Sequence, residues 1–152
     1  MYMNQEELLQ LENELSFESF CHKDAFYVGQ MIIKKITQER LKPVRIRVVM
    51  NHDIVFQYLM DGKTGTKWLD YKQNTLEKYQ HSTYYVYKQH QDDQLFQDEE
   101  LKKGYVICGG GFPLIVKHQI IGGIYVSGLE HDQDHQVIVD VLKEYKNESI
   151  SK

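Results

Sequence analysis

The stretch from Cys108 to His135 holds many of the residues whose types and spacing could do chemistry. It opens on a glycine-rich run made of Gly109, Gly110, Gly111, Phe112 and Pro113. Seven of the ten glycines of the chain lie between positions 104 and 128, which predicts backbone with positive φ or a surface close against it. Consecutive N–H groups there could hold an anion or carboxylate, as a nest does; a bulge or tight bend at a strand start is the alternative.

Two histidines and two aspartates close this stretch. His131 and His135 are four residues apart, so a continuous helix would present both on one face, with Asp132 and Asp134 between them. Imidazole and carboxylate groups are suitable ligands for a divalent metal ion, and the candidate ligands are His131, Asp134 and His135. The alternative is that the aspartates cap a helix and interact with its positive end.

Further candidates lie earlier in the chain. A helix would place Trp68 and Lys72 on one face, where Lys72 could receive a carboxylate against the apolar wall of Trp68. The alternative is a tryptophan at the core edge beside a snorkelling lysine. His81 and Ser82 are adjacent, so their side chains diverge on a helix, which argues against a Ser–His nucleophile pair. Cys108 is either a thiol activated by backbone dipoles or a small buried apolar residue.

Length and composition are those of an ordinary soluble domain. The chain has 152 residues, 41% of them apolar and 26% charged, with a net charge of −4. No stripe of Lys and Arg is present, so we expect neither nucleic acid nor membrane as a partner. The N-terminus lacks the features of a signal peptide and the two cysteines form no Cys-x-x-Cys pair, which together favour a cytoplasmic protein with reduced thiols.

Hydrophobic periodicity predicts the elements that must position these residues. Helices are expected over 4–14, 23–39 and 68–85, and near the C-terminus after a cap at Asp132 or Asp134. Strands are expected over 44–50 and 54–59 around a tight turn at 51–53, over 105–108, and as a hairpin of 112–117 with 120–127 closed at 118–119. Residues 88–103 are polar, with a helical turn or two before Gly104. This order favours an α+β fold with one antiparallel sheet.

A set of motifs recurs in a defined order along the chain. Its members are Phe20, Asp24, Ala25, Gly29, Pro43, Val44, Phe56, Gly62, Trp68, Lys72, His81, Ser82, Thr83, Tyr84, Gly109 to Pro113, Ile121, Gly122, Val126 to Leu129, Asp134 and His135. The set resembles the haem-degrading domain family of HbpS-like and GlcG-like proteins, most closely its small cytosolic branch. The resemblance spans residues 16–146 of a chain that we treat as one domain, 1–152.

The resemblance implies a five-stranded antiparallel sheet with packed helices, of the profilin-like or PAS-like kind and in two or three layers. It also implies a homo-oligomer, with haem as a candidate cofactor. The chain departs from the family pattern at Cys108, where the family has a histidine before the glycines. A thiol at that position is a soft ligand in place of the imidazole.

We therefore expect an oligomeric ligand-binding domain rather than a dedicated enzyme. Its ligand would be a small anion or carboxylate, and haem is the specific candidate that the resemblance suggests, with coordination by His81, His131 or His135 left open. The candidate ligand-binding residues are Gly109, Gly110, Gly111, Phe112, Pro113, Ser127, Gly128, Trp68, Lys72 and His81. Two alternatives remain: a haem-degrading enzyme, and a non-catalytic scaffold that recruits a protein partner.

Overall fold

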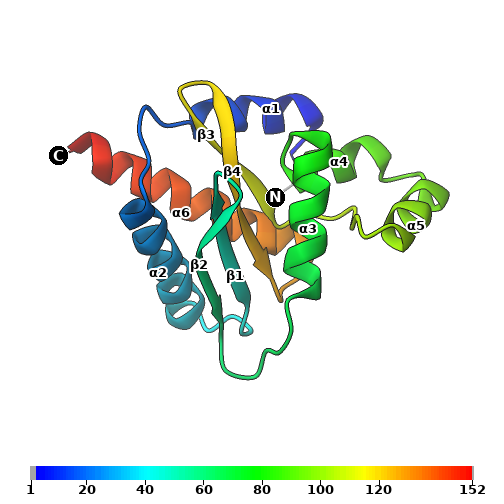
Figure 1. Cartoon of the computed structure of the whole chain (residues 1–152), viewed down its shortest axis with the longest axis horizontal. Coiled ribbons are helices and arrows are strands. Elements are labelled where there is room, and N and C mark those ends of the chain that lie inside the picture. Colours follow the sequence, from blue (N-terminus) through cyan, green and yellow to red (C-terminus); the bar gives the residue numbers. More distant parts are fainter. Residues whose placement is uncertain (1–2, 152) are drawn as a thin grey trace.

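The computed structural model describes residues 3–151, with side chains up to residue 148 (Figure 1). Six helices and four strands lie within that range. In chain order the elements are α1 (Gln5–Glu14), α2 (His22–Gln38), β1 (Arg45–Met50), β2 (Asp53–Leu59), α3 (Lys67–Tyr79), α4 (Thr83–His90), α5 (Gln94–Lys102), β3 (Gly111–Val116), β4 (Gln119–Ser127) and α6 (His131–Ser151). This is an α+β fold, as predicted.

The four strands form one antiparallel sheet in the order β2-β1-β4-β3. Both hairpins turn through two residues with positive φ, Asn51 (51°) with His52 (72°) and Lys117 (50°) with His118 (67°). Such pairs form the turn whose twist matches that of the flanking strands. The first turn was predicted, and the second lies one residue earlier than the predicted pair at 118–119.

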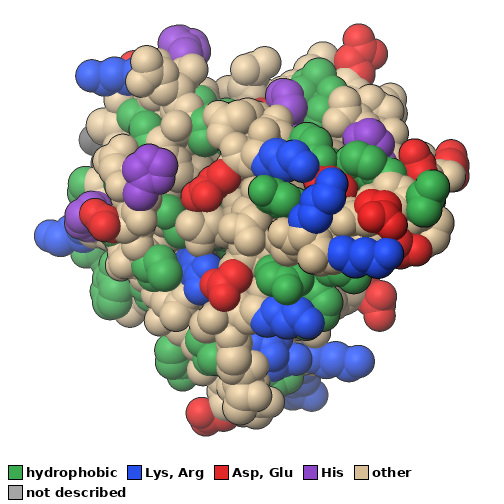
Figure 2. Space-filling model, turned by 45° about the vertical axis from the view of Figure 1, so that its right-hand side comes forward, with side chains coloured by type: hydrophobic (Ala, Val, Ile, Leu, Met, Phe, Trp, Pro, Cys, Tyr) green, Lys and Arg blue, Asp and Glu red, His purple; other side chains and the backbone are tan. Residues whose placement is uncertain are grey.

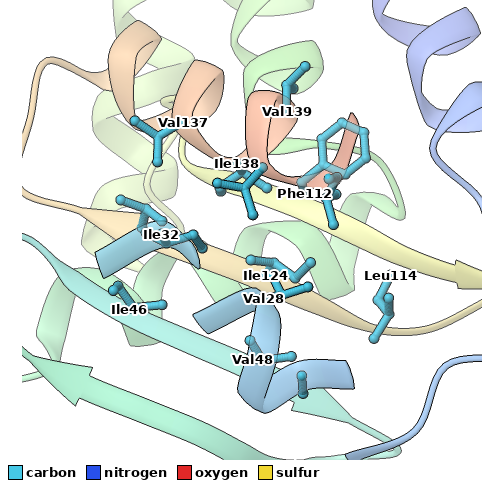
Figure 3. Close-up of a cluster of buried hydrophobic side chains, with 14 of the residues drawn as sticks. Val28, Ile32, Ile46, Val48, Phe112, Leu114, Ile124, Val137, Ile138 and Val139 are labelled. Carbon is cyan, nitrogen blue, oxygen red and sulfur yellow. The ribbon is translucent and has the colours of Figure 1, made fainter. Parts of the chain in front are cut away.

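Helices cover both faces of the sheet, which gives three layers. On one face, α2 and α6 bury the main core against alternate residues of β1, β3 and β4 (Figure 3). The predicted stripe of α2 is buried there, and its members are Ala25, Val28, Ile32 and Ile36. On the other face, α3 packs Leu69 and Leu76 on Val49 and Tyr125. Because side chains alternate along a strand, neighbouring residues of β1 and β4 serve opposite cores.

The predicted fifth strand, at 105–108, does not form. This segment instead runs along α3, where Thr75 Oγ1 donates to the Val106 carbonyl oxygen (2.8 Å) and Asn74 Nδ2 to the Gly104 carbonyl oxygen (3.0 Å). Its backbone groups are thus partly satisfied by side chains of a helix. Phe17 pairs instead with the outer edge of β3, through its amide and the Ile115 carbonyl oxygen (2.8 Å).

The predicted helix over 68–85 is two helices. It ends at Gln80, which takes the left-handed conformation with φ 59°, and α4 begins after Ser82. Ser82 caps α4 by accepting from the Tyr85 amide (3.2 Å), while its own amide donates to Glu12 of α1 (3.1 Å). The polar segment that follows forms α5, capped by Asp93. Among the described residues, no helix combines the length and apolar character needed to cross a membrane.

The start of α6 differs from its predicted cap. The helix begins at His131, so Asp132 and Asp134 lie within its first turn rather than before it. The Asp134 carboxylate nevertheless reaches back and accepts from the Leu129 amide (3.0 Å). It therefore satisfies an N–H group that precedes the helix, not one of the first-turn N–H groups that an N-cap side chain binds.

Candidate functional site

A shallow cleft of about 520 Å³ lies where the start of α3, the segment before β3, the end of β4 and the start of α6 meet. The β2–α3 loop and the first residue of β1 complete its wall. Its lining residues are Arg45, Lys63, Trp68, Lys72, Val106, Cys108, Ser127, Gly128, Leu129, His131 and Asp134. The volume is in the range typical of small-molecule sites.

A buried ion pair forms the floor of this cleft. Lys72 Nζ lies 3.0 Å from Asp134 Oδ2 and donates to the Val126 carbonyl oxygen at 2.8 Å. Lys72 and Asp134 are only 4% and 2% exposed. Burial raises the pKa of the Asp134 carboxyl, and the nearby Lys72 ammonium and the Leu129 amide oppose that rise. The ion pair joins α3 to α6. Its two hydrogen bonds use two of the three N–H groups of the Lys72 ammonium.

The glycine run packs between the Lys72–Asp134 ion pair and the first residues of α4. Gly110 has φ 118°, and a Cβ there would lie 2.4 Å from Lys72 Nζ and 2.5 Å from the Val126 carbonyl oxygen. The Gly109 amide donates to His131 Nδ1 (2.9 Å) and the Gly111 amide to Thr83 Oγ1 (2.9 Å). These two N–H groups are therefore bound by the protein itself, so a nest that offers them to an anion does not form.

The structure brings part of the predicted binding set together. Trp68, Lys72, Ser127 and Gly128 line one cleft, although they come from two distant parts of the chain, α3 and the end of β4. Residues 109–113 are buried and support that cleft without lining it. His81 lies elsewhere: its Nδ1 is 3.1 Å from Glu12 Oε1, and its ring lies 4.6 Å from the Tyr85 ring.

The predicted metal ligands do not converge. His131 Nδ1 accepts from Gly109, Asp134 binds Lys72, and the His135 ring stacks on Tyr84 at 4.8 Å. Within residues 3–151, no group of three or more His, Cys, Asp or Glu side chains is placed to hold a metal ion. Each of these three side chains has a different neighbour, so a metal site that they share stays a prediction.

His135 is a neutral buried histidine. It is 2% exposed, and neither ring nitrogen has a hydrogen-bond partner in the structure. Burial lowers its pKa to about 4, and the positive charge that His131 can carry acts in the same direction. The pKa of His131 is also lowered, again mainly by burial. Both imidazoles are therefore uncharged at neutral pH.

Two cationic residues of the cleft were missed by sequence reasoning. Arg45 enters because it pairs with Ser127 across the β1–β4 ladder, and its guanidinium donates to the carbonyl oxygens of Thr64 (2.8 Å) and Gly65 (2.9 Å). These bonds hold the loop that carries Lys63. The alternation of Arg45 with apolar residues of β1 indicates which face of the sheet Arg45 lies on. It does not indicate which strand pairs with β1, so the cleft could not be predicted from it.

The charge of the cleft is positive. Arg45, Lys63 and Lys72 face a single carboxylate, that of Asp134, on a chain whose net charge is −4. Figure 2 shows several Lys and Arg side chains beside hydrophobic ones on the lower right part of the face that it presents. Clefts lined by one sign of charge concentrate ligands of the opposite sign.

Apolar and thiol groups complete the walls. Trp68 is 38% exposed and meets Tyr71 edge to face, with ring centroids 6.0 Å apart. Burial raises the pKa of the Cys108 thiol, although the Lys72 charge opposes this, so the group is protonated at neutral pH. The cleft therefore offers an aromatic wall and an uncharged thiol beside its cationic groups.

A smaller cavity of about 310 Å³ adjoins the cleft across Gly128 and Leu129. Its charged residues are Arg40, Lys42 and Glu130. Positive charge thus continues past the end of β4, and an extended anion would meet cations on both sides of Gly128.

Comparison with known proteins agrees with the motifs. A family model described as haem degrading protein HbpS-like matches residues 20–143. The chain is 31% identical over 150 residues to a UPF0303 protein of Psychromonas ingrahamii, covering 92% of this chain and 94% of that relative. It is 30% identical over 145 residues to a UPF0303 protein of Brucella canis, covering 91% of this chain and 85% of the relative.

Solved structures share the fold. The crystal structure of the Ybr137w protein matches with a TM-score of 0.85 at 23% identity, covering 99% of this chain and 91% of that one. The PduOC:heme complex matches at 0.68 with 18% identity (82% and 94% covered), and HbpS at 0.65 with 18% identity (82% and 88% covered). Since the family match spans residues 20–143 and the identity to a UPF0303 protein reaches 31%, the chain belongs to the HbpS-like family of haem-degrading proteins.

Proposed function

We propose that this protein binds a small carboxylate-bearing anion in the cleft between α3, β4 and α6. The observation that carries the proposal is the gathering of Arg45 and Lys63 beside Trp68 in one cleft of an acidic chain, above the buried Lys72–Asp134 pair. Cationic groups bind carboxylates by charge-assisted hydrogen bonds, and an aromatic wall suits an apolar or conjugated ligand body. Ser127 and Gly128 form the rim where such a ligand would cross toward the adjoining cavity.

Haem is the specific ligand that we propose to test first. The family description and the PduOC:heme complex support it, and the chemistry of the cleft suits it in part. Arg45 and Lys63 would receive propionates, and Trp68 and Leu129 would contact the macrocycle. An iron ligand would come from the Cys108 sulfur after loss of its proton, because His131 Nδ1 accepts from the Gly109 amide and Nε2 of the neutral ring therefore carries the proton.

The binding test is a haem titration of the full chain followed by absorbance. We expect a shifted Soret band at micromolar haem, and weaker binding by several-fold in Lys63→Gln, which removes one charge-assisted contact. Trp68→Ala should also weaken binding, whereas Leu101→Ala, at a position of similar exposure (39% against 38%), should not. An unshifted Soret band would exclude haem as the ligand. Calorimetry with aromatic and aliphatic dicarboxylates would then decide whether any anion binds, and no heat from any of them would overturn the proposal.

A haem-degrading activity would follow only if bound haem is consumed. Incubation of the haem complex with a reductant and oxygen distinguishes haem degradation from haem binding alone, because ring opening removes the Soret band and releases iron. A complex that keeps its spectrum under these conditions is a binding protein.

We further propose that the protein is a cytoplasmic homo-oligomer. Both cysteines of the described chain are free thiols, which suits a reducing compartment. Phe26 of α2 and Ile54 and Tyr58 of the edge strand β2 are 44–51% exposed and offer apolar contact area. Light scattering should give a mass of several chains, and a monomer at tens of micromolar would contradict this part of the proposal.

A further inference from the structure

A second, larger cavity lies between α2 and the C-terminal part of α6. Its volume is about 560 Å³. It is lined by Asp24, Tyr27, Gln30, Met31, Lys34, Tyr145 and Glu148. None of these residues lines the anion cleft, so the two sites are independent in their chemistry.

One wall of this cavity carries a carboxylate held in its charged form. Asp24 Oδ2 accepts from the Cys21 amide at 2.7 Å, and Oδ1 accepts from the Tyr145 hydroxyl. Burial acts to raise the pKa of Asp24, but these hydrogen bonds outweigh it and the pKa is lowered. Burial and the bond to Asp24 raise the pKa of Tyr145, so its hydroxyl stays a donor. Glu148 adds a second carboxylate, against the single ammonium of Lys34.

Aromatic rings flank these carboxylates. Tyr27 is 44% exposed and is set by contact with Phe26, with ring centroids 6.0 Å apart. Tyr145 is set by its bond to Asp24 and by an edge contact with Phe20 at 6.3 Å. Met31 supplies a polarisable, adaptable apolar surface beside them. Tyrosine faces, ionised carboxylates and a thioether attract a cation with an apolar body.

We propose that the cavity between α2 and α6 binds a small organic cation of the substituted-ammonium class. The charged group lies near Asp24 and Glu148, with its alkyl groups against Tyr27 and Tyr145. The charge preference is opposite to that of the cleft beside α3. If one site fails to bind its ligand, the proposal for the other site is therefore unaffected.

The test is an NMR titration of the full, isotope-labelled chain with choline chloride at constant ionic strength. We expect amide shifts confined to α2 and to the region of Tyr145, with a dissociation constant in the millimolar range. The neutral isostere 3,3-dimethyl-1-butanol should bind about fivefold more weakly, because it lacks the charge. Equal binding of the two probes, shifts centred elsewhere, or no shifts at tens of millimolar choline would each overturn the proposal.

Variants locate the site. Tyr27→Ala should weaken choline binding about fivefold, whereas Leu101→Ala, at a similarly exposed position (39% against 44%) on α5, should leave it unchanged. Glu148→Gln should weaken binding and Lys34→Gln should strengthen it, since each change alters the local charge by one in opposite directions. All four positions are exposed, so the fold is expected to survive. If the dissociation constant for choline is unchanged in both Tyr27→Ala and Glu148→Gln, this cavity is excluded as the binding site.

Discussion

At the scale of single residues, the Lys72 ammonium is a buried charge with two close polar partners. It lies 3.0 Å from Asp134 Oδ2 and 2.8 Å from the Val126 carbonyl oxygen, under the bare backbone of Gly110. Lys72→Met would leave the Asp134 charge buried without its partner, a loss of about 3–5 kcal/mol in similar pairs. Urea unfolding should show this loss, and Lys72→Met combined with Asp134→Leu should recover part of it. A single variant as stable as the parent would contradict the structural role of the pair.

His135 governs a second residue-scale prediction. Its folded-state pKa of about 4 lies below the ordinary value of 6.5, so the unfolded chain binds a proton that the folded chain excludes. Stability is complete above pH 6.5 and falls as the pH drops from 6.5 toward 4, by at most about 1.4 kcal/mol per pH unit. His131, whose pKa is also lowered, adds to this slope.

The measurement is urea unfolding at several pH values across that window. His135→Phe keeps an aromatic ring against Tyr84 and removes the titrating group, so the curve should flatten. His22→Gln, at an exposed position, serves as the control and should follow the parent profile. A parent-like slope in His135→Phe would mean that other groups account for acid sensitivity.

At the scale of elements, the break between α3 and α4 depends on a strained residue. Gln80 takes φ 59° and ψ 35° at the end of α3, a conformation that costs a side-chain-bearing residue about 1 kcal/mol. Gln80→Gly should therefore stabilise the protein by about 0.5–1 kcal/mol in thermal or chemical unfolding. Gln30→Gly, inside α2, should instead destabilise it by about 1 kcal/mol. Equal losses from both changes would show that the left-handed position is not a cost to the fold.

At the scale of the whole molecule, the sheet separates two cores. Ile32 belongs to the core under α2 and α6, and Leu76 to the smaller one under α3. Both are almost fully buried, at 0% and 1% exposure, so each change to alanine should cost about 2–5 kcal/mol. Amide hydrogen exchange should distinguish the two cores. Leu76→Ala should speed exchange of the amides of α3, the helix that carries Trp68 and Lys72, whereas Ile32→Ala should not. Equal acceleration in α3 from both would show that the cores are not separate.

Some of this organisation follows from local pattern. The stripe of Ala25, Val28, Ile32 and Ile36 predicts α2 because each of these residues lies three or four positions from the next. Asn51 predicts the first turn because its side chain tolerates positive φ. The strand expected over 105–108 fails because α3 side chains, distant in sequence, bind its carbonyl groups. The surroundings of His131 and His135 could not be predicted from local pattern, because their burial and neighbours depend on where α6 lies against α4.

The amino-acid sequence by itself determined the α+β class and the family, and it singled out the glycines, Trp68 and Lys72 that lie in or beside the cleft. Those features are local, because burial periodicity and glycine tolerance act within a few residues. Only the tertiary structure decided the strand order β2-β1-β4-β3, which sets Arg45 opposite Ser127, and the pairing of Lys72 with Asp134. The reason is physical: cross-strand register and ion pairing join residues that are 62 to 82 positions apart, and their distance depends on how the whole core packs.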